Sequence, residues 1–181
     1  TRPLLISSGK GGVGKSSVTT NLAVALAQQG HSVGVVDADI YGYSIPRMLG
    51  TDRDPVVIDE MLVPPEQWGV RCISIGYFVP EGQAVIWRGP MLHKALEQFL
   101  RDVQWGHLDY LLIDMPPGTG DVQMGLARML PSTALVVVTT PALAAQKVAQ
   151  RAADMARRSF LEVIGVIENM SAFTCDHGDS Y

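Results

Sequence analysis

A glycine-rich segment near the amino terminus constrains this chain more than any other part of its sequence. Residues 9–16 read GKGGVGKS, and this spacing of glycine, lysine and serine is typical of a phosphate-binding P-loop between a strand and a helix. Glycines let the backbone curl so that several N–H groups face phosphate oxygens, and the following helix adds the positive end of its dipole. We therefore expect an α/β fold that binds a nucleotide.

The positions of this loop have separate predicted roles. Lys15 is expected to reach the β- and γ-phosphates, and the Ser16 hydroxyl is expected to bind Mg²⁺. The other predicted cofactor-binding residues of the loop are Gly9, Gly11, Gly12, Val13, Gly14 and Ser17. Lys10 is a second lysine, at a position that an ordinary P-loop leaves unconstrained.

The flanks of the loop supply the strand and the helix that a P-loop requires. Residues 3–8 form a short apolar run that suits a buried strand. After the loop, apolar side chains recur at helical spacing through Val18, Leu22 and Leu26, and Gly30 stands where a helix commonly ends. This context favours a true phosphate loop over a chance glycine-rich turn.

Apolar runs and helical patterns alternate along the rest of the chain. The predicted strands are 32–37, 70–75, 109–114, 134–140 and 163–167, and the predicted helices are 91–103, with Pro90 in the first turn, 122–130 and 142–158. Near-continuous apolar strands that alternate with helices indicate a doubly wound, mainly parallel sheet with helices on both faces. The stretch 47–69 has the weakest pattern, and we expect a mobile loop there.

Composition and charge narrow the class of protein. The 181 residues are 47% hydrophobic, which suits a single P-loop domain over residues 1–181. The net charge of −4 argues against a nucleic-acid partner, and no apolar run approaches the roughly 20 residues of a membrane span. Two cysteines do not make a disulfide framework, so a reducing, cytoplasmic location is expected.

Ligands of such sheets gather at the carboxyl ends of the strands, so the polar residues there are the candidates for the site. The strand 109–113 is followed by Asp114, in the arrangement of a Walker B carboxylate that holds Mg²⁺. In the segment after it, Gly118 or Gly120 could donate an N–H to a γ-phosphate. We expect this segment to act as a nucleotide-sensing switch. Asp121 either belongs to the switch or caps the helix 122–130.

Two acids follow the strand 32–36. Asp37 and Asp39 are two residues apart, so both carboxylates project to one side of an extended strand end. We expect Asp37 to support Mg²⁺ and Asp39 to orient the attacking water. The alternative is that one of them caps the next turn.

An asparagine follows the strand 163–167. Asn169 could read a purine edge, because an amide accepts from the adenine amino group and donates to a ring nitrogen. The guanine-reading pattern Asn-Lys-x-Asp is absent from this strand end, which favours ATP over GTP. The alternative is an ordinary turn asparagine.

Together these strings resemble a known family. The loop resembles the deviant P-loop of the MinD/ParA class of ATPases, and four further strings are similar to the Mrp/ApbC family of ATP-binding iron–sulfur cluster carriers. They are DADIYGYSIP (37–46), WRGP (87–90), DMPPGTGD (114–121) and ENMS (168–171). The resemblance implies an ATP-hydrolysing homodimer with two nucleotides at its interface and iron–sulfur client proteins. It also implies that Lys10 reaches the partner's nucleotide, as an arginine finger does.

The predicted cluster site departs from the family pattern. Members carry Cys-x-x-Cys shortly after ENMS, and here Cys175 matches the first cysteine while Gly178 stands in place of the second. Two subunits would then supply only two thiolates, and His177 either adds an imidazole or belongs to a polar loop. Cys72 lies in a predicted strand and reads as a buried structural cysteine. Relatives continue beyond this loop, so we expect a fragment that lacks C-terminal elements and an N-terminal accessory domain.

Two rival functions remain. A MinD/ParA-like switch that positions partners on a membrane would need an amphipathic basic terminal helix, which these residues lack, and the acidity of the chain disfavours DNA. A P-loop ATPase that docks a partner without carrying a cluster is kept open by the missing second cysteine.

Overall fold

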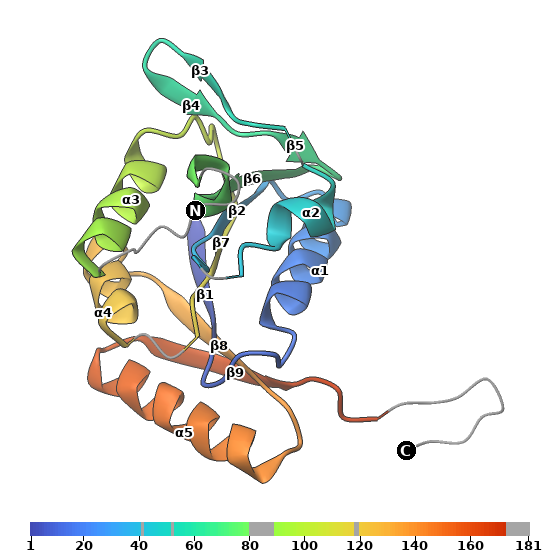
Figure 1. Cartoon of the computed structure of the whole chain (residues 1–181), viewed down its shortest axis with the longest axis vertical. Helices are drawn as coiled ribbons and strands as arrows, with labels where there is room; N and C mark the ends of the chain where they lie inside the picture. Colours follow the sequence, from blue (N-terminus) through green and yellow to red (C-terminus); the bar gives the residue numbers. More distant parts are fainter. Residues whose placement is uncertain (41, 52, 80–88, 118–119, 173–181) are drawn as a thin grey trace, which may run out of the picture.

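A computed structural model describes residues 1–40, 42–51, 53–79, 89–117 and 120–172, and it contains a seven-stranded sheet between two layers of helices (Figure 1). The strands are β1 (Arg2–Ser8), β2 (Val33–Asp37), β3 (Val56–Ile58), β4 (Met61–Val63), β5 (Glu66–Gln67), β6 (Val70–Ser74), β7 (Tyr110–Asp114), β8 (Ala134–Thr139) and β9 (Glu162–Glu168). The helices are α1 (Lys15–Gln28), α2 (Ile45–Leu49), the 3₁₀ helix η1 (Ile75–Phe78), α3 (Gly89–Arg101), α4 (Gly120–Met129) and α5 (Leu143–Arg158).

The strand order brings the candidate acids to one edge of the sheet. The order is β5-β6-β2-β7-β1-β8-β9, and every pair is parallel except the edge pair β5 with β6. Asp114 at the end of β7 pairs in register with Asp37 of β2 on one side and with Ile6 of β1 on the other. Since β1 runs directly into the P-loop, this register places both carboxylates beside the loop.

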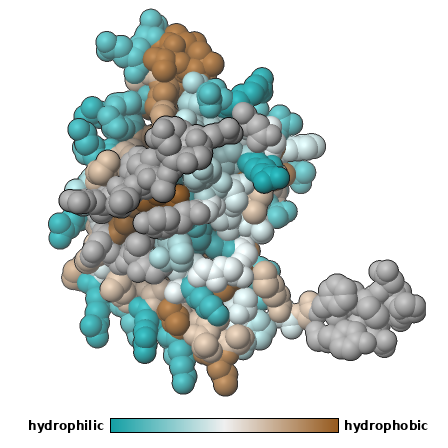
Figure 2. Space-filling view, in the orientation of Figure 1, coloured by the Kyte–Doolittle hydropathy of each residue, from teal (hydrophilic) through white to brown (hydrophobic). Residues whose placement is uncertain are grey.

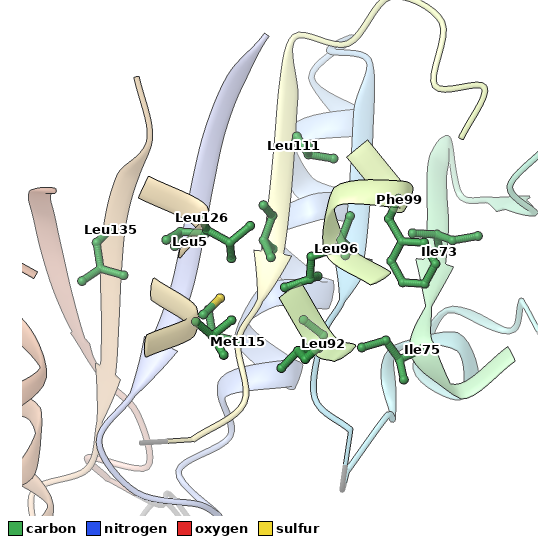
Figure 3. Packing of buried hydrophobic residues seen from close by; sticks show 14 of the residues in the cluster. Leu5, Ile73, Ile75, Leu92, Leu96, Phe99, Leu111, Met115, Leu126 and Leu135 are labelled. Atoms are coloured by element: carbon green, nitrogen blue, oxygen red, sulfur yellow. The ribbon is translucent and has the colours of Figure 1, made fainter. Parts of the chain in front are cut away.

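Alternation along β1 explains the two layers. Leu5 packs into the core shared with α3, α4 and α5, whereas its neighbours Leu4 and Ile6 pack into the core shared with α1 and α2. Figure 3 shows Leu5 beside Leu126 of α4, with Leu96 of α3 in the same core. Successive side chains of a strand point to opposite faces, so a near-continuous apolar strand requires helices on both sides. The fold class predicted from the sequence is therefore confirmed.

Most predicted elements are confirmed to within two residues at each end, and Pro90 lies in the first turn of α3 as expected. The prediction of a mobile loop over 47–69 is wrong. That stretch contains the end of α2, the hairpin β3–β4 and β5. The hairpin turns at Asp59 and Glu60, which both have positive φ, and Leu62 bonds to the backbone of Asp102 and Gln104.

The hairpin was missed because its strands are short and lack one buried face. Val56, Val57 and Ile58 are all more than half exposed, and the hairpin lies at the top of Figures 1 and 2, where apolar surface is visible. Of the two alternatives for Asp121, the N-cap does not apply, because α4 already begins at Gly120 and Asp121 lies inside its first turn, and a role in the nucleotide-sensing switch stays a prediction. The longest described helix, α5, has 16 residues, and no described helix has the length and apolarity to cross a bilayer.

Candidate nucleotide-binding site

The P-loop has the backbone of an open phosphate cradle. It leaves β1 at Ser8 and enters α1 at Lys15, and Gly12 and Gly14 adopt left-handed φ values of 79° and 81°. A side chain at Gly11 or Gly12 would meet no atom within 4 Å, so the space beside the loop is open. Left-handed backbone favours glycine, and the open side leaves room for phosphate oxygens.

Gly9 packs directly against α5, and its predicted role in phosphate binding stays a prediction. A Cβ on Gly9 would lie 2.5 Å from the backbone carbon of Val148 in α5, so the start of the loop rests directly on that helix. Backbone atoms cannot give way as a flexible side chain can, and overpacking of this kind costs about 1–3 kcal/mol. The first glycine of the motif therefore joins the loop to α5.

We expect Gly9→Ala to lower the free energy of unfolding of the nucleotide-free protein by about 1–3 kcal/mol. Gly11→Ala is the matched control, because it adds the same methyl group to the same loop in open space, and its effect should stay within about 0.5 kcal/mol. Urea unfolding of both variants measures the difference. Equal losses in the two variants would contradict the contact with α5.

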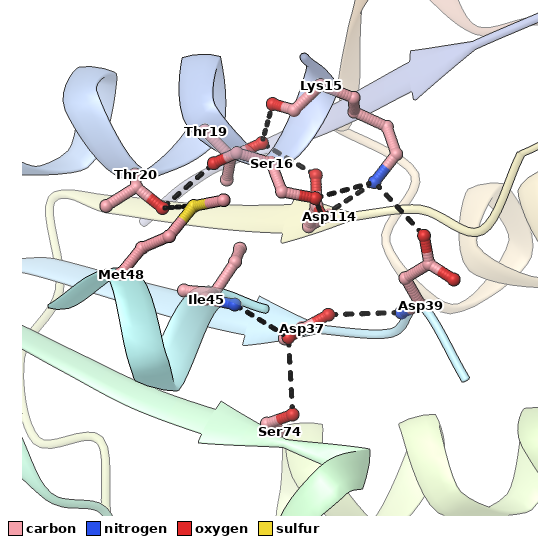
Figure 4. A network of polar contacts seen from close by, with 10 residues as sticks. All are labelled: Lys15, Ser16, Thr19, Thr20, Asp37, Asp39, Ile45, Met48, Ser74 and Asp114. Atoms are coloured by element: carbon pink, nitrogen blue, oxygen red, sulfur yellow. Dashed lines mark hydrogen bonds and ion pairs between the residues drawn. The ribbon is translucent and has the colours of Figure 1, made fainter. Parts of the chain in front are cut away.

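Asp114 is the buried centre of the site (Figure 4). Its Oδ2 accepts from Lys15 Nζ at 2.6 Å and from Ser16 Oγ at 2.6 Å, while its Oδ1 accepts from Thr19 Oγ1 at 2.7 Å. A fully buried carboxylate needs a counter-charge and hydrogen-bond donors, and the first two turns of α1 supply an ammonium group and two hydroxyl groups. The structure thus brings together three residues that the sequence analysis placed in the site.

Thr19 belongs to the same hydrogen-bond network and was missed by the sequence analysis. Its hydroxyl bonds both Asp114 and the Lys15 carbonyl, and the side chain is fully buried. The available signal was its position four residues after Lys15, because such residues lie on the same face of a helix. Thr19 holds the Asp114 carboxylate from the side opposite to Lys15 (Figure 4).

Asp37 caps the turn that leads into α2. Its Oδ1 accepts from the Asp39 N–H at 3.2 Å, and its Oδ2 accepts from the Ile45 N–H at 3.2 Å and from Ser74 Oγ at 3.3 Å. The turn-capping alternative therefore applies to Asp37, and its role beside Mg²⁺ stays a prediction. Ser74, at the end of the neighbouring strand β6, was not anticipated from the sequence.

The pKa of Asp37 is raised from 3.8 to about 7, chiefly by burial and secondly by the nearby Asp114 carboxylate, although the Asp39 and Ile45 N–H donors and Lys15 act to lower it. The folded chain therefore binds more protons than the unfolded chain between these two values. Stability from this group is fully present below pH 3.8 and is lost as the pH rises through about 7.

We expect the nucleotide-free protein to lose about 2 kcal/mol of stability relative to Asp37→Asn between pH 5 and pH 7, at roughly 1.4 kcal/mol per pH unit. The asparagine cannot titrate, so any lost hydrogen bond shifts its curve by a constant amount. Urea unfolding of both proteins across this range gives the difference. Parallel stability curves would show that Asp37 titrates well below this window.

Asp39 and Lys10 occupy the open side of the site. Asp39 Oδ2 lies 3.8 Å from Lys15 Nζ, and its side chain is 13% exposed. Lys10 is exposed and makes no hydrogen bond or ion pair with the described residues. Asp39 thus lies beside the lysine predicted to hold the γ-phosphate, while Lys10 is exposed and pairs with no described residue of its own site. These positions are compatible with the predicted roles in orienting water and in reaching across a dimer.

Asn169 clamps the P-loop from the end of β9. Its Nδ2 donates to the Val13 carbonyl at 2.9 Å, and its backbone N–H bonds the Thr139 carbonyl. The Asn169 amide also fills the space that a side chain at Gly14 would need. Reading of adenine by this amide therefore stays a prediction, and the described bond fixes Asn169 within reach of the nucleotide loop.

The predicted cluster residues are only partly within the described chain. Cys175, His177 and Gly178 lie outside the described residues, as does Gly118 of the predicted switch. Cys72 is fully buried in β6, and burial raises the pKa of its thiol far above the ordinary value, with the Asp37 carboxylate as a second cause. It is therefore the structural cysteine that the sequence analysis expected.

The oxygen atoms beside the P-loop are suitable ligands for an Mg²⁺ ion that is bound mainly through a nucleotide. Ser16, Asp37 and Asp114 offer hydroxyl and carboxylate oxygens, which are the ligands that this hard cation prefers. In the described part of the chain, no group of three His, Cys, Asp or Glu side chains could bind a metal ion alone. Mg²⁺ commonly uses one or two protein ligands together with substrate phosphates and water, so the residues fit it.

Comparison with known proteins decides the family. Residues 1–181 match the ParA family, described as NUBPL iron-transfer P-loop NTPase. The chain belongs to this family. The iron-sulfur cluster carrier protein of Mycobacterium bovis is 54% identical over 178 residues, which cover 98% of this chain and 47% of that protein. The same-named protein of Bacillus subtilis is 51% identical over 94% of this chain and 48% of its own length. The chain spans about half the length of these relatives.

Solved structures agree with the family assignment. A nucleotide-binding protein of Archaeoglobus fulgidus, solved in complex with ADP, has a TM-score of 0.84 and 38% identity over 99% of this chain and 71% of its own. The cell division ATPase MinD of Pyrococcus furiosus has a TM-score of 0.67 at 23% identity, over 92% of this chain and 71% of its own. The MinD likeness extends to the fold alone. Membership in a P-loop NTPase family makes this chain a nucleotide-binding protein.

Proposed function

We propose that this chain is the ATP-binding part of a cytoplasmic, dimeric carrier that assembles and transfers iron–sulfur clusters and hydrolyses ATP. The observation that supports it most is an open P-loop whose Lys15 and Ser16 donate hydrogen bonds to the buried Asp114. The chain that carries this loop is about 50% identical to proteins named iron-sulfur cluster carriers. The residues around Asp114 support nucleotide binding and hydrolysis, and the similarity to named carriers supports the iron–sulfur cluster as the transferred group.

The site residues have distinct tasks in the proposed hydrolysis. Lys15 leaves Asp114 to bind the β- and γ-phosphates, because a triphosphate is a stronger anion than one carboxylate. Ser16 and Asp114 would hold Mg²⁺, with Asp37 in support, and the ion would supply positive charge that neutralises the phosphates. Asp39 orients the attacking water, and Lys10 of the other subunit stabilises the charge that develops during phosphoryl transfer.

Cys175 is the thiolate through which this segment holds the cluster. One such thiolate from each subunit gives two ligands across the dimer, fewer than the four that these clusters prefer. Asp176 and Asp179 follow the cysteine closely in sequence, and their negative charges oppose formation of its thiolate. A weakly held cluster is suited to a protein that must pass it to client proteins.

Anaerobic reconstitution of the full-length protein with iron and sulfide tests the cargo. We expect visible sulfur-to-iron absorbance that Cys175→Ser abolishes and Cys72→Ser preserves, because Cys72 is buried in the core. A thermal melt of each variant confirms that the fold is intact. Iron binding by Cys175→Ser equal to that of the parent would remove the cluster role from this segment.

The second candidate is a P-loop ATPase that docks a partner and carries no cluster. The glycine at position 178, in place of the family's second cysteine, favours it. Under this alternative ATP would still bind and be hydrolysed at the same site. Neither the parent nor Cys175→Ser would retain iron after reconstitution, so the same experiment separates the two functions.

A further inference from the structure

The carboxyl end of α5 carries an aromatic side chain where helices favour glycine. The Leu161 N–H donates a hydrogen bond to the Ala156 carbonyl, and the Phe160 N–H donates one to the Arg157 carbonyl. These two hydrogen bonds together define a Schellman motif. Phe160 is the residue just beyond the cap, and its φ of 59° is left-handed. An L-residue with a bulky side chain is strained in this conformation.

The end of α1 shows the unstrained version of the same cap. His31 N–H bonds the Leu26 carbonyl and Gly30 N–H bonds the Ala27 carbonyl, with Gly30 at a φ of 90°. The two helices thus end in the same motif, once with glycine and once with phenylalanine. Folding of α5 gives no reason for the difference, because Phe160 is 97% exposed and packs into neither core.

Phe160 stands at the edge of a groove. The ends of α4 and α5 and the strand beginnings that follow them meet at the left of Figure 1, and a groove of about 440 Å³ lies between them. Its apolar lining includes Met124, Leu161 and Phe160. This volume accommodates a few side chains of a ligand. The strained aromatic ring therefore extends an apolar surface that a ligand can cover.

Two arginines make the groove cationic. Arg128 of α4 and Arg158 of α5 line it, and neither forms an ion pair within the described part of the chain, whereas the adjacent Arg157 pairs with Asp154. No acidic residue is among the described residues that line the groove. Unpaired guanidinium groups bind carboxylates in a bidentate manner, and they do so best beside apolar surface that excludes water.

We propose that this groove is a docking site for an acidic protein segment that carries an aromatic or large aliphatic side chain. The apolar side chain covers Phe160 and Leu161, and flanking carboxylates pair with Arg128 and Arg158. Charge complementarity selects this occupant, because a purely apolar segment would leave both guanidinium groups unpaired under it. The site is separate from the P-loop, since it lies at the strand beginnings and the P-loop follows a strand end.

A displayed library of random twelve-residue peptides, panned on the full-length protein, tests the proposal. We expect enrichment of peptides that combine Asp or Glu with Phe, Trp or Leu. The double variant Arg128→Gln/Arg158→Gln should bind synthetic versions of them at least about tenfold more weakly. Arg151→Gln, which removes an exposed α5 charge outside the groove, is the matched control and should bind within about twofold of the parent.

Phe160→Gly separates binding from folding. Glycine relieves the left-handed strain of the cap, so the melting temperature should stay equal or rise while peptide affinity falls at least about tenfold. A lower melting temperature would mean that the ring serves the fold, and the proposal would be wrong. The proposal would also be wrong if no acidic peptides were enriched, or if the double variant bound them as well as the parent does. It would likewise be wrong if a second copy or another segment of the same chain occupied the groove.

Discussion

Lys15→Ala is expected to abolish measurable Mg-ATP binding, a loss of at least about 100-fold, and to destabilise the nucleotide-free protein by about 3 kcal/mol. Both effects come from one ammonium group. It is the main cation for the phosphates, and without nucleotide it neutralises the fully buried Asp114 at 2.6 Å. Removing it leaves a buried charge whose remaining donors, among the described residues, are the Ser16 and Thr19 hydroxyl groups.

A second substitution separates the two effects. Lys15→Ala/Asp114→Asn removes the uncompensated charge, so it should recover part of the lost stability and none of the lost affinity. Calorimetric titration with Mg-ATP and urea unfolding measure the two quantities. If Lys15→Ala were as stable as the parent, the Lys15–Asp114 pair would not support the fold. If it still bound Mg-ATP tightly, the assignment of the phosphate site would be wrong.

Lys10→Ala is expected to bind ATP nearly as well as the parent and to lose about 1,000-fold in hydrolysis, the scale of a cation supplied by a partner. Lys10 is exposed, and the cation that contacts Asp114 within the chain is Lys15, which supports action of Lys10 in the other subunit. Mixing Lys10→Ala with Asp39→Ala then rebuilds one site per mixed dimer, from an intact Asp39 and a donated Lys10. Random pairing should restore about a quarter of the parent's activity.

Turnover of ATP in these mixtures is the measurement, and the two singly substituted homodimers are its controls. Differently tagged subunits establish how much mixed dimer is present. If mixed dimers form and activity stays at the level of the homodimers, Lys10 does not act across the interface. If Lys10→Ala alone hydrolyses ATP at the parent rate, it has no catalytic role.

The elements that could be predicted are those with a repeating apolar signal or a motif. The strand before the P-loop, the helix after it and its glycine end at Gly30 follow from local sequence. Asp114 was found because an apolar strand that ends in acid is recognisable without knowledge of its neighbours. In each case the physical cause lies within a few residues of the feature.

The missed features depend on contacts between distant segments. Ser74 bonds Asp37 because β6 lies beside β2, and nothing near Ser74 in the sequence signals this. The clamp of Asn169 on Val13 joins residues 156 positions apart. The hairpin β3–β4 was overlooked because it has no buried face, so the alternation that identifies strands is absent. Such features follow from the strand order, which the local sequence does not specify.

The central claim is that ATP binding and hydrolysis are coupled to iron–sulfur cluster transfer in one protein, and a cluster-transfer assay tests it most directly. The full-length protein, reconstituted anaerobically, is mixed with an acceptor enzyme that lacks its four-iron cluster, and recovery of the acceptor's activity is followed. We predict that Mg-ATP changes the rate of recovery for the parent and leaves it unchanged for Lys15→Ala loaded with the same amount of iron. Equal rates for the parent with and without Mg-ATP would contradict the coupling.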